Sequence, residues 1–197
     1  MREIRRILAD VEGLRVLDLD EAHIPASPDE DHLEPFETFE ENARSKARFF
    51  FEQSGIPTVA DDSGIAVDAL DGAPGVRSKR FAPRGLAGEA QDVANNRHLV
   101  DLLKGVPAAE RTARYVCVAV FVDGSGRELL ARGEAEGVVI DEPRGTGGFG
   151  YDPHILIPEL GRTFAELSPE EKNARSHRGV AFRRLVEQLR TDVGAGS

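Results

Sequence analysis

Residues 112–140, TARYVCVAVFVDGSGRELLARGEAEGVVI, decide the fold of this chain. The first part, 112–122, is rich in valine and other residues typical of strands, and 128–140 has a similar composition. Between them the turn Asp-Gly-Ser-Gly at 123–126 predicts that the two runs pair as a long antiparallel hairpin. Cys117, the single cysteine, cannot form a disulfide within the chain, and its place in the first run predicts a buried thiol in a reducing compartment.

Two helix starts are marked by capping boxes, in which a hydroxyl side chain and a glutamate three residues later satisfy each other's backbone amides. Thr38 with Glu41 predicts a helix that ends at 54–55, and Ser168 with Glu171 predicts a second one with proline at its first position. Apolar periodicity adds helices at 2–9, at 92–103 and at the C-terminus, and short strands are expected at 14–19 and 57–60.

Composition narrows the class of protein. A length of 197 residues with 40% apolar residues suits one globular domain over 1–197. The net charge of -10 repels nucleic acid and anionic membranes. The first twenty residues contain no apolar core of a signal peptide, and no apolar run approaches the roughly 20 residues of a membrane helix. We therefore expect a cytoplasmic protein that binds neither nucleic acid nor membrane.

Adjacent carboxylates, Asp61 and Asp62, follow the strand expected at 57–60. Two close acids at the carboxyl end of a strand suit a divalent cation, whereas a solvated turn capped by aspartate is an equally good interpretation of the four residues Asp-Asp-Ser-Gly alone. Acidic residues upstream add oxygen donors that favour the metal site: Glu34, Glu37, Glu40 and Glu41.

A glycine-rich segment, RGTGGFGYD at 144–152, matches neither a Walker nor a dinucleotide-binding pattern. Its glycines let the backbone approach a ligand closely, and Phe149 or Tyr151 can stack on a base. The alternative is a tight turn with two aromatic residues in the core.

Basic residues gather in one short polar stretch that contains Lys172, Arg175, His177 and Arg178. On an acidic protein such a stretch concentrates positive potential and can hold an anion, although a solvated helix face is the ordinary explanation. Lys46, Lys79 and Arg80 are further cations with the same two interpretations.

Four segments together resemble the inosine triphosphate pyrophosphatase family: 38–46 (TFEENARSK), 60–76 (ADDSGIAVDALDGAPGV), 142–153 (EPRGTGGFGYDP) and 164–178 (FAELSPEEKNARSHR). The resemblance implies an α/β fold with an elongated, twisted mixed sheet flanked by helices and two lobes with a central nucleotide cleft. It also implies a homodimer that hydrolyses ITP, dITP and XTP to the monophosphate and pyrophosphate with Mg2+.

The same resemblance assigns roles to residues of this chain. Asp62 is implied as the general base and a metal ligand, with Asp61 beside it as a second catalytic residue and Glu34 as the other metal ligand. Hydrogen-bond donation from His177 or Arg178 to a 6-oxo group would favour hypoxanthine and xanthine over adenine. The substrate-binding residues implied are Ser63, Lys46, Phe149, Gly150, Tyr151, Asp152, Lys172, His177 and Arg178.

One departure from the family concerns the start of the chain. Family members begin with a strand and a loop of the form T/S-x-N-x-x-K ahead of a helix like that at 2–9, whereas this chain starts at the helix. We expect an upstream in-frame codon that encodes this segment. The alternatives are a nucleotide-binding protein with impaired catalysis and, because of the paired aspartates, a metal phosphatase with an aspartate nucleophile that releases orthophosphate.

Overall fold

The structure is a computed structural model that describes residues 2–8, 14–25, 30–83 and 86–194. Its backbone divides into two compact units. Unit 1 comprises Met1–Asp62, Cys117–Gly133 and His177–Ser197, and unit 2 comprises Ser63–Val116 and Glu134–Ser176. The candidate site residues are therefore distributed over both units.

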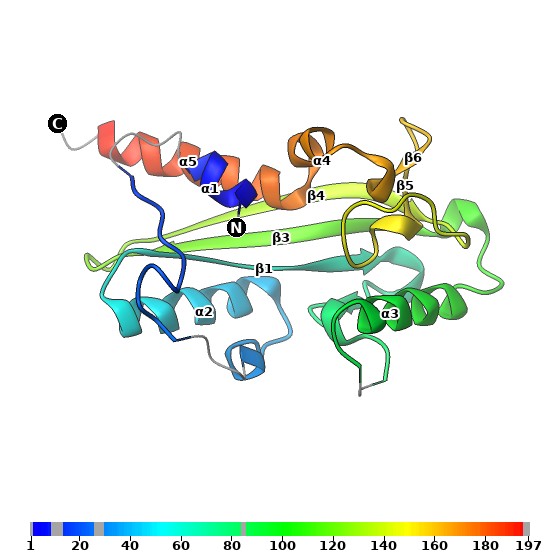
Figure 1. Ribbon diagram of the computed structural model, residues 1–197, viewed down its shortest axis with the longest axis horizontal. Helices are drawn as coiled ribbons and strands as arrows, with labels where there is room; N and C mark the ends of the chain where they lie inside the picture. Colours follow the sequence, from blue (N-terminus) through cyan, green and yellow to red (C-terminus); the bar gives the residue numbers. More distant parts are fainter. Residues whose placement is uncertain (1, 9–13, 26–29, 84–85, 195–197) are drawn as a thin grey trace. The chain divides into compact units, whose positions relative to one another are not determined.

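Six strands form a sheet in the order β2-β1-β3-β4-β5-β6 (Figure 1). The predicted hairpin is confirmed as β3 (Thr112–Val122) and β4 (Glu128–Val139). The other strands are β1 (Thr58–Val67), β2 (Pro74–Gly75), β5 (Ile155–Ile157) and β6 (Arg162–Thr163). The α/β class is confirmed, but β1 with β2, β4 with β5, and β5 with β6 all pair antiparallel, so these pairings do not show the mixed strand directions that the resemblance implies.

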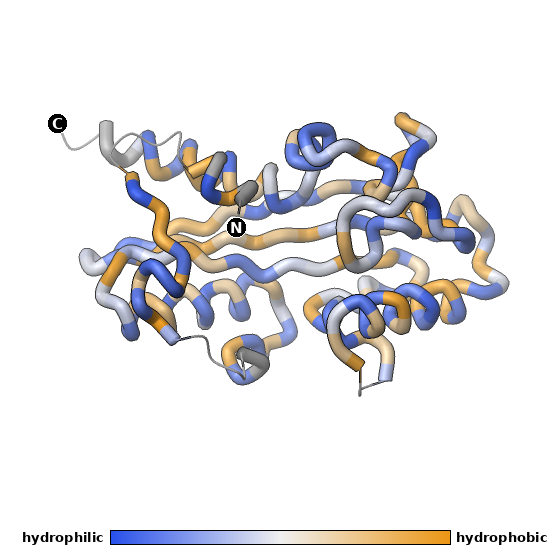
Figure 2. The backbone as a smooth tube through the Cα atoms, viewed as in Figure 1, coloured by the Kyte–Doolittle hydropathy of each residue, from blue (hydrophilic) through white to orange (hydrophobic). Residues whose placement is uncertain are grey.

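In unit 1, helices lie on both faces of the strands. α5 (His177–Gly194) packs against α1 (Arg2–Leu8) on one face, and α2 (Phe39–Ser54) lies on the other (Figure 1). Figure 2 shows β3 as a largely apolar stretch, as its buried side chains require. The core beneath α5 and α1 includes Leu8, Cys117, Ala119, Phe121, Phe182 and Leu185.

Both predicted ends of α2 are confirmed. The Thr38 hydroxyl accepts a hydrogen bond from the Glu41 amide over 3.2 Å, and the Gly55 amide donates to Phe51 O over 2.8 Å with φ at 65°. Glycine adopts this left-handed conformation without the steric cost that a Cβ atom brings. The helix is thereby fixed in register, so Asn42 and Lys46, four residues apart, share one face.

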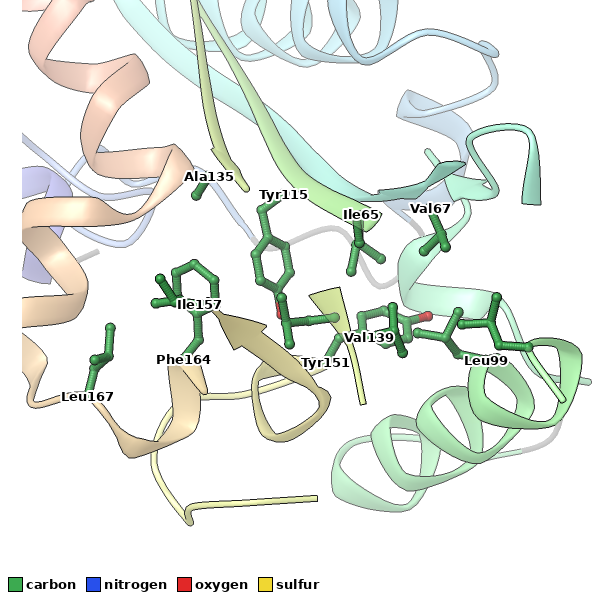
Figure 3. Close-up of a cluster of buried hydrophobic side chains, with 13 residues drawn as sticks. Ile65, Val67, Leu99, Tyr115, Ala135, Val139, Tyr151, Ile157, Phe164 and Leu167 are labelled. Atoms are coloured by element: carbon green, nitrogen blue, oxygen red, sulfur yellow. The ribbon is translucent and has the colours of Figure 1, made fainter. Parts of the chain in front are cut away.

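In unit 2, α3 (Glu89–Leu102) contributes Leu99 to an apolar core that includes two tyrosines (Figure 3). The short helix α4 (Pro169–Arg175) has no buried residue. The Tyr115 ring meets Phe164 edge-on with centroids 5.2 Å apart. Tyr151 is also buried in this cluster. Remaining core members include Ile65, Val67, Leu99, Val139, Ile155 and Leu167.

The strand predicted at 14–19 is wrong, because residues 14–18 have no regular structure and Leu19 lies in a turn. A strand depends on backbone pairing with a neighbouring strand, which side-chain composition alone does not supply. The helix predicted at 2–9 is confirmed as α1, and Ala9 lies outside the described residues. Within the described ranges, no helix has the length and apolar character needed to cross a bilayer.

Candidate active site

Asp61 and Asp62 lie within β1, not at its end as the sequence analysis expects. Successive side chains of a strand point to opposite faces of the sheet. Asp62 is directed to α2, where it contacts Asn42 and Lys46, whereas Asp61 is directed to α5, where it contacts Arg178. The two adjacent carboxylates therefore do not converge on one cation.

Asp62 is only 6% exposed and is held through both of its oxygens. Asn42 Nδ2 donates to Asp62 Oδ2 over 3.1 Å, and Lys46 Nζ lies 3.5 Å from Asp62 Oδ1. Lys46 Nζ also lies 2.7 Å from Glu34 Oε1. These four residues form what we call the Asp62 cluster. A buried carboxylate requires such donors, because an unpaired charge in the interior costs several kcal/mol, on the order of 3 to 5.

Asn42 is a member of the Asp62 cluster that the sequence analysis missed. Its Oδ1 accepts from the Phe36 amide over 2.9 Å, and its Nδ2 donates to Phe36 O over 3.1 Å as well as to Asp62. The side chain therefore joins the acidic segment before α2 to the carboxylate of β1. One signal was available: Asn42 is a polar residue next to Ala43, on the face of α2 that the apolar pattern predicts to be buried.

The donors of the Asp62 cluster fit a magnesium ion. Glu34 and Asp62 each direct a carboxylate oxygen at the same cationic atom, Lys46 Nζ. Mg2+ commonly takes one or two protein carboxylates and completes its shell with water and substrate phosphates. Among the residues that the structure describes, no three histidine, cysteine, aspartate or glutamate side chains form a metal-binding group.

Asp61 forms an ion pair with Arg178 and does not join the Asp62 cluster. Arg178 donates to Asp61 Oδ2 through Nη2 over 2.9 Å and through Nε over 3.1 Å. The Cys117 thiol donates to the same oxygen over 3.6 Å, and burial followed by the Asp61 charge raises the pKa of Cys117 far above its ordinary value. Cys117 is thus the inert, buried thiol that the sequence predicts.

The basic stretch does not form one helix face. Ser176 has extended backbone with φ at -63° and ψ at 144°, and it separates α4 from α5. Lys172 on α4 belongs to unit 2, whereas His177 and Arg178 open α5 in unit 1. The interpretation as one solvated helix face is therefore wrong.

The two aromatic residues of the glycine-rich loop differ: Phe149 fits the alternative of an exposed ring that can stack on a base, and Tyr151 fits the alternative of a core residue. Phe149 is 64% exposed, and Lys172 Nζ lies 4.4 Å from the centroid of its ring. Tyr151 is buried, and its hydroxyl donates to Ser78 O over 2.8 Å. An exposed ring beneath an ammonium group is available to a flat ligand, while Tyr151 anchors the loop in the core.

Asp152 holds the loop together from inside unit 2, where it is 3% exposed. Its Oδ1 accepts from the Tyr115 hydroxyl over 3.1 Å, its Oδ2 accepts from the Phe149 amide over 2.8 Å, and Lys172 Nζ also contacts Oδ2. Burial first, and the Asp152 charge second, raise the pKa of Tyr115 well above its ordinary value, so this hydroxyl stays a donor at neutral pH.

Gly148 is required by this arrangement. Its φ is 76°, and a Cβ atom at this position would lie 2.0 Å from Asp152 Oδ2. Any side chain here would displace the carboxylate that orients Phe149 and Lys172. This close approach of the Gly148 backbone to Asp152 is one physical reason for the glycines at 144–152.

Lys172 is positioned by the predicted capping box of α4, which is confirmed. The Glu171 amide donates to Ser168 Oγ over 3.2 Å, and the Ser168 amide donates to Glu171 Oε2 over 2.8 Å. The Arg162 hydrogen bond to Glu171, and then the Ser168 amide, lower the pKa of the Glu171 carboxyl. Ser63, the remaining predicted residue, follows Asp62 in β1 and is half-buried.

A cavity of about 430 Å³ in unit 1 borders the Asp62 cluster at Lys46. Its lining is mainly apolar, including Val16, Phe50, Phe121 and Phe182. It shares with the charged residues described above only Lys46 and Asp61.

An α/β protein with a buried carboxylate among amide and ammonium donors, and with an exposed ring beside a lysine, fits the class of nucleotide-hydrolysing enzymes. The chain is a member of the Ham1 family, whose sequence profile matches residues 1–188.

Close relatives and solved structures agree with this membership. The chain is 49% identical over 192 residues to a dITP/XTP pyrophosphatase of Ralstonia nicotianae, with 96% of this chain and 91% of the relative covered. It is 48% identical to a dITP/XTP pyrophosphatase of Frankia alni, over 96% of this chain and 92% of the relative. A HAM1 protein from Coxiella burnetii matches the fold with a TM-score of 0.83 at 36% identity, over 96% of this chain and 92% of that one.

Proposed function

We propose that this protein hydrolyses dITP, XTP and ITP to the nucleoside monophosphate and pyrophosphate. The observation that carries the proposal is the buried Asp62 carboxylate, which is held by Asn42 and Lys46 in a chain similar to dITP/XTP pyrophosphatases. Activation of water by a fixed carboxylate is the chemistry that such a hydrolysis requires.

In the proposed step, Asp62 accepts a proton from the attacking water. The water oxygen forms a bond to phosphorus, and the phosphoanhydride bond between the α and β phosphates breaks, so pyrophosphate leaves. Lys46 lies beside Asp62 and is the cation in place to offset phosphate charge there. Arg178, which Asp61 orients, and His177 are proposed to donate to the base or the phosphates.

Magnesium would be held by Glu34 and Asp62, whose carboxylate oxygens both lie beside Lys46 Nζ. When bound, this ion neutralises the developing charge of the leaving pyrophosphate. Asp61 is proposed as a positioning residue for Arg178, because its side chain is directed to α5 and not to the Asp62 cluster.

The purine is proposed to stack on Phe149 with Lys172 at its edge. Gly150 contributes backbone shape at this place, and Tyr151 anchors the loop through Ser78. Asp152 is proposed to act on the substrate indirectly, since Tyr115, the Phe149 amide and Lys172 already occupy its oxygens.

Product analysis tests the proposed activity. Purified protein with Mg2+ should convert dITP and XTP to monophosphate and pyrophosphate, with dATP much slower. Orthophosphate as the first product would instead support the aspartate phosphatase alternative, and dITP binding without turnover would support the impaired nucleotide-binding protein. Hydrolysis in water labelled with ¹⁸O then identifies the attacked phosphorus, because the label appears in the monophosphate or in the pyrophosphate.

The cellular location and the oligomeric state of the protein also belong to the proposal. We propose a homodimer in the cytoplasm, which the family resemblance implies. Light scattering on the purified protein measures the assembly, and a monomer at the concentrations used for the assay would contradict it.

A further inference from the structure

Helix α3 lies outside every motif considered so far, yet it holds the glycine-rich loop. Two of its side chains, Asp92 and Asn96, are one turn apart and contact the same residue of the loop. The Gly150 amide donates to Asp92 Oδ2 over 3.1 Å, and Asn96 Nδ2 donates to Gly150 O over 2.8 Å. Both polar backbone atoms of Gly150 are therefore bound by α3, an arrangement that we call the α3 clamp.

The orientation of the Asn96 amide is determined by its neighbours. Asn96 is 9% exposed, and its Nδ2 donates to Asp92 O over 2.9 Å as well as to Gly150 O. Exchange of the amide oxygen and nitrogen would bring an acceptor against two carbonyl oxygens. The Oδ1 atom is buried and finds no partner among the described residues, which is a cost that the two donated bonds offset.

Two neighbouring amides of the loop backbone are already bound by carboxylates. The Phe149 amide is bound to Asp152, and the Gly150 amide is bound to Asp92. A purine cannot use these two donors without opening the loop, whereas the exposed Phe149 ring and Lys172 remain available to it. The position of the ring then depends on whatever fixes its backbone.

The adjacent residue Asn95 secures a second point of the same region. Its Nδ2 donates to Lys79 O over 3.1 Å and contacts Ser78 O at 3.3 Å, and its Oδ1 accepts from the Ala82 amide over 2.8 Å. Ser78 O also accepts from the Tyr151 hydroxyl. Helix α3 thus fixes Gly150 directly and Tyr151 through Ser78, on either side of one peptide bond.

We infer that Asp92 and Asn96 are positioning residues for purine binding, which set the place of the Phe149 ring through Gly150. This inference rests on the proposed function, because it takes the purine to stack on Phe149. The hydrogen bonds of the clamp lie within unit 2, whereas Asp62 and Lys46 belong to unit 1, so loss of the clamp should weaken substrate binding and leave the chemical step nearly unchanged.

Asn96→Asp is the sharpest test, because it keeps the shape of the side chain and places a carboxylate against two carbonyl oxygens. We expect KM for dITP to rise about tenfold or more, with kcat within about threefold of the wild-type value. The dissociation constant of dIMP, measured by calorimetry without metal, should rise with KM. Hydrogen exchange of the 144–152 amides should become faster.

Val93→Ala is the matched control, since Val93 is 62% exposed on the same helix. It should leave KM and dIMP binding unchanged. Asp92→Asn supplies a second variant that keeps the side-chain shape if Asn96→Asp does not fold, and it should raise KM about threefold. A KM within twofold of wild type in the folded variants, with or without a lower melting temperature, overturns the inference. Wild-type protein that does not hydrolyse dITP would overturn the proposed function instead.

Discussion

Asn42 Nδ2 donates to Asp62 Oδ2 over 3.1 Å, while the same side chain exchanges two hydrogen bonds with the Phe36 backbone. A neutral amide therefore connects the buried carboxylate to the segment that carries Glu34. Because the amide donates to Asp62 Oδ2, it fixes the position of the carboxylate that is proposed to accept a proton from water. Asn42 of α2 therefore helps to fix the position of the proposed base.

Asp62→Asn should abolish turnover and leave the fold intact. It removes the basic oxygen and one metal-ligand charge but keeps the shape of the side chain, so we expect kcat for dITP to fall by about 10² to 10⁴. Pyrophosphate release under saturating dITP measures the effect. More than about a tenth of wild-type kcat, a barrier change below about 1.4 kcal/mol, would exclude Asp62 as the general base. Asp61→Asn is the matched comparison and should lower kcat for dITP less than Asp62→Asn does.

Asn42→Asp should lower kcat by about tenfold or more, because it places a second carboxylate against Asp62 and against Phe36 O. Asn42→Ala should also reduce kcat, since it removes the hydrogen bond from the amide to Asp62 Oδ2. Steady-state kinetics with dITP provide the measurement. Arg48→Ala, on an exposed part of the same helix, is the control and should behave as wild type. Unchanged kcat in folded Asn42→Asp would mean that the amide serves the fold alone.

Phe149→Ala should weaken the binding of dITP and of XTP by a similar factor. A stacking ring contributes about 1 to 3 kcal/mol per base, which corresponds to about 5-fold to 150-fold in KM. Since Phe149 is 64% exposed, the melting temperature of the variant should stay close to the wild-type value. Leu102→Ala, another exposed apolar residue of unit 2, serves as the control. A lower melting temperature with unchanged KM would place Phe149 among the residues that stabilise the fold.

Arg178→Ala should reduce the ratio of kcat/KM for dITP over dATP if the guanidinium reads the 6-oxo group. An equal loss for both nucleotides would assign Arg178 to the phosphates. Asp61→Asn weakens the pair with Arg178 and should shift the same ratio in the same direction by a smaller factor. The two variants together show whether Asp61 acts through Arg178.

Acidification should destabilise the protein partly through Glu171. Its carboxyl has a pKa below the ordinary value of 4.5 because Arg162 and the Ser168 amide stabilise the ionised form. A pKa lowered in the folded state gives stability that is present above the unfolded pKa and is lost as pH falls through the folded one. Glu171→Gln should therefore show a smaller loss of melting temperature than wild type between about pH 6 and about pH 3.5. Equal losses would mean that Glu171 makes no contribution.

The sequence by itself determined the features that depend on neighbouring residues. The hairpin of β3 and β4, both ends of α2 and the capping box of α4 follow from strand composition, turn residues and side-chain caps, which act within a few residues. The irregular loop at 144–152 follows from its glycines in the same way.

Only the tertiary structure decided which distant residues meet. It placed Asp61 and Asp62 inside a longer strand, because β1 extends as far as its backbone pairs with neighbouring strands. Their side chains lie on opposite faces, because successive side chains of a strand alternate. It left 14–18 without strand structure and separated exposed Phe149 from buried Tyr151. Contacts of Asn42 with Asp62 and of Asn96 with Gly150 join residues 20 and 54 positions apart, and no local spacing encodes such pairs.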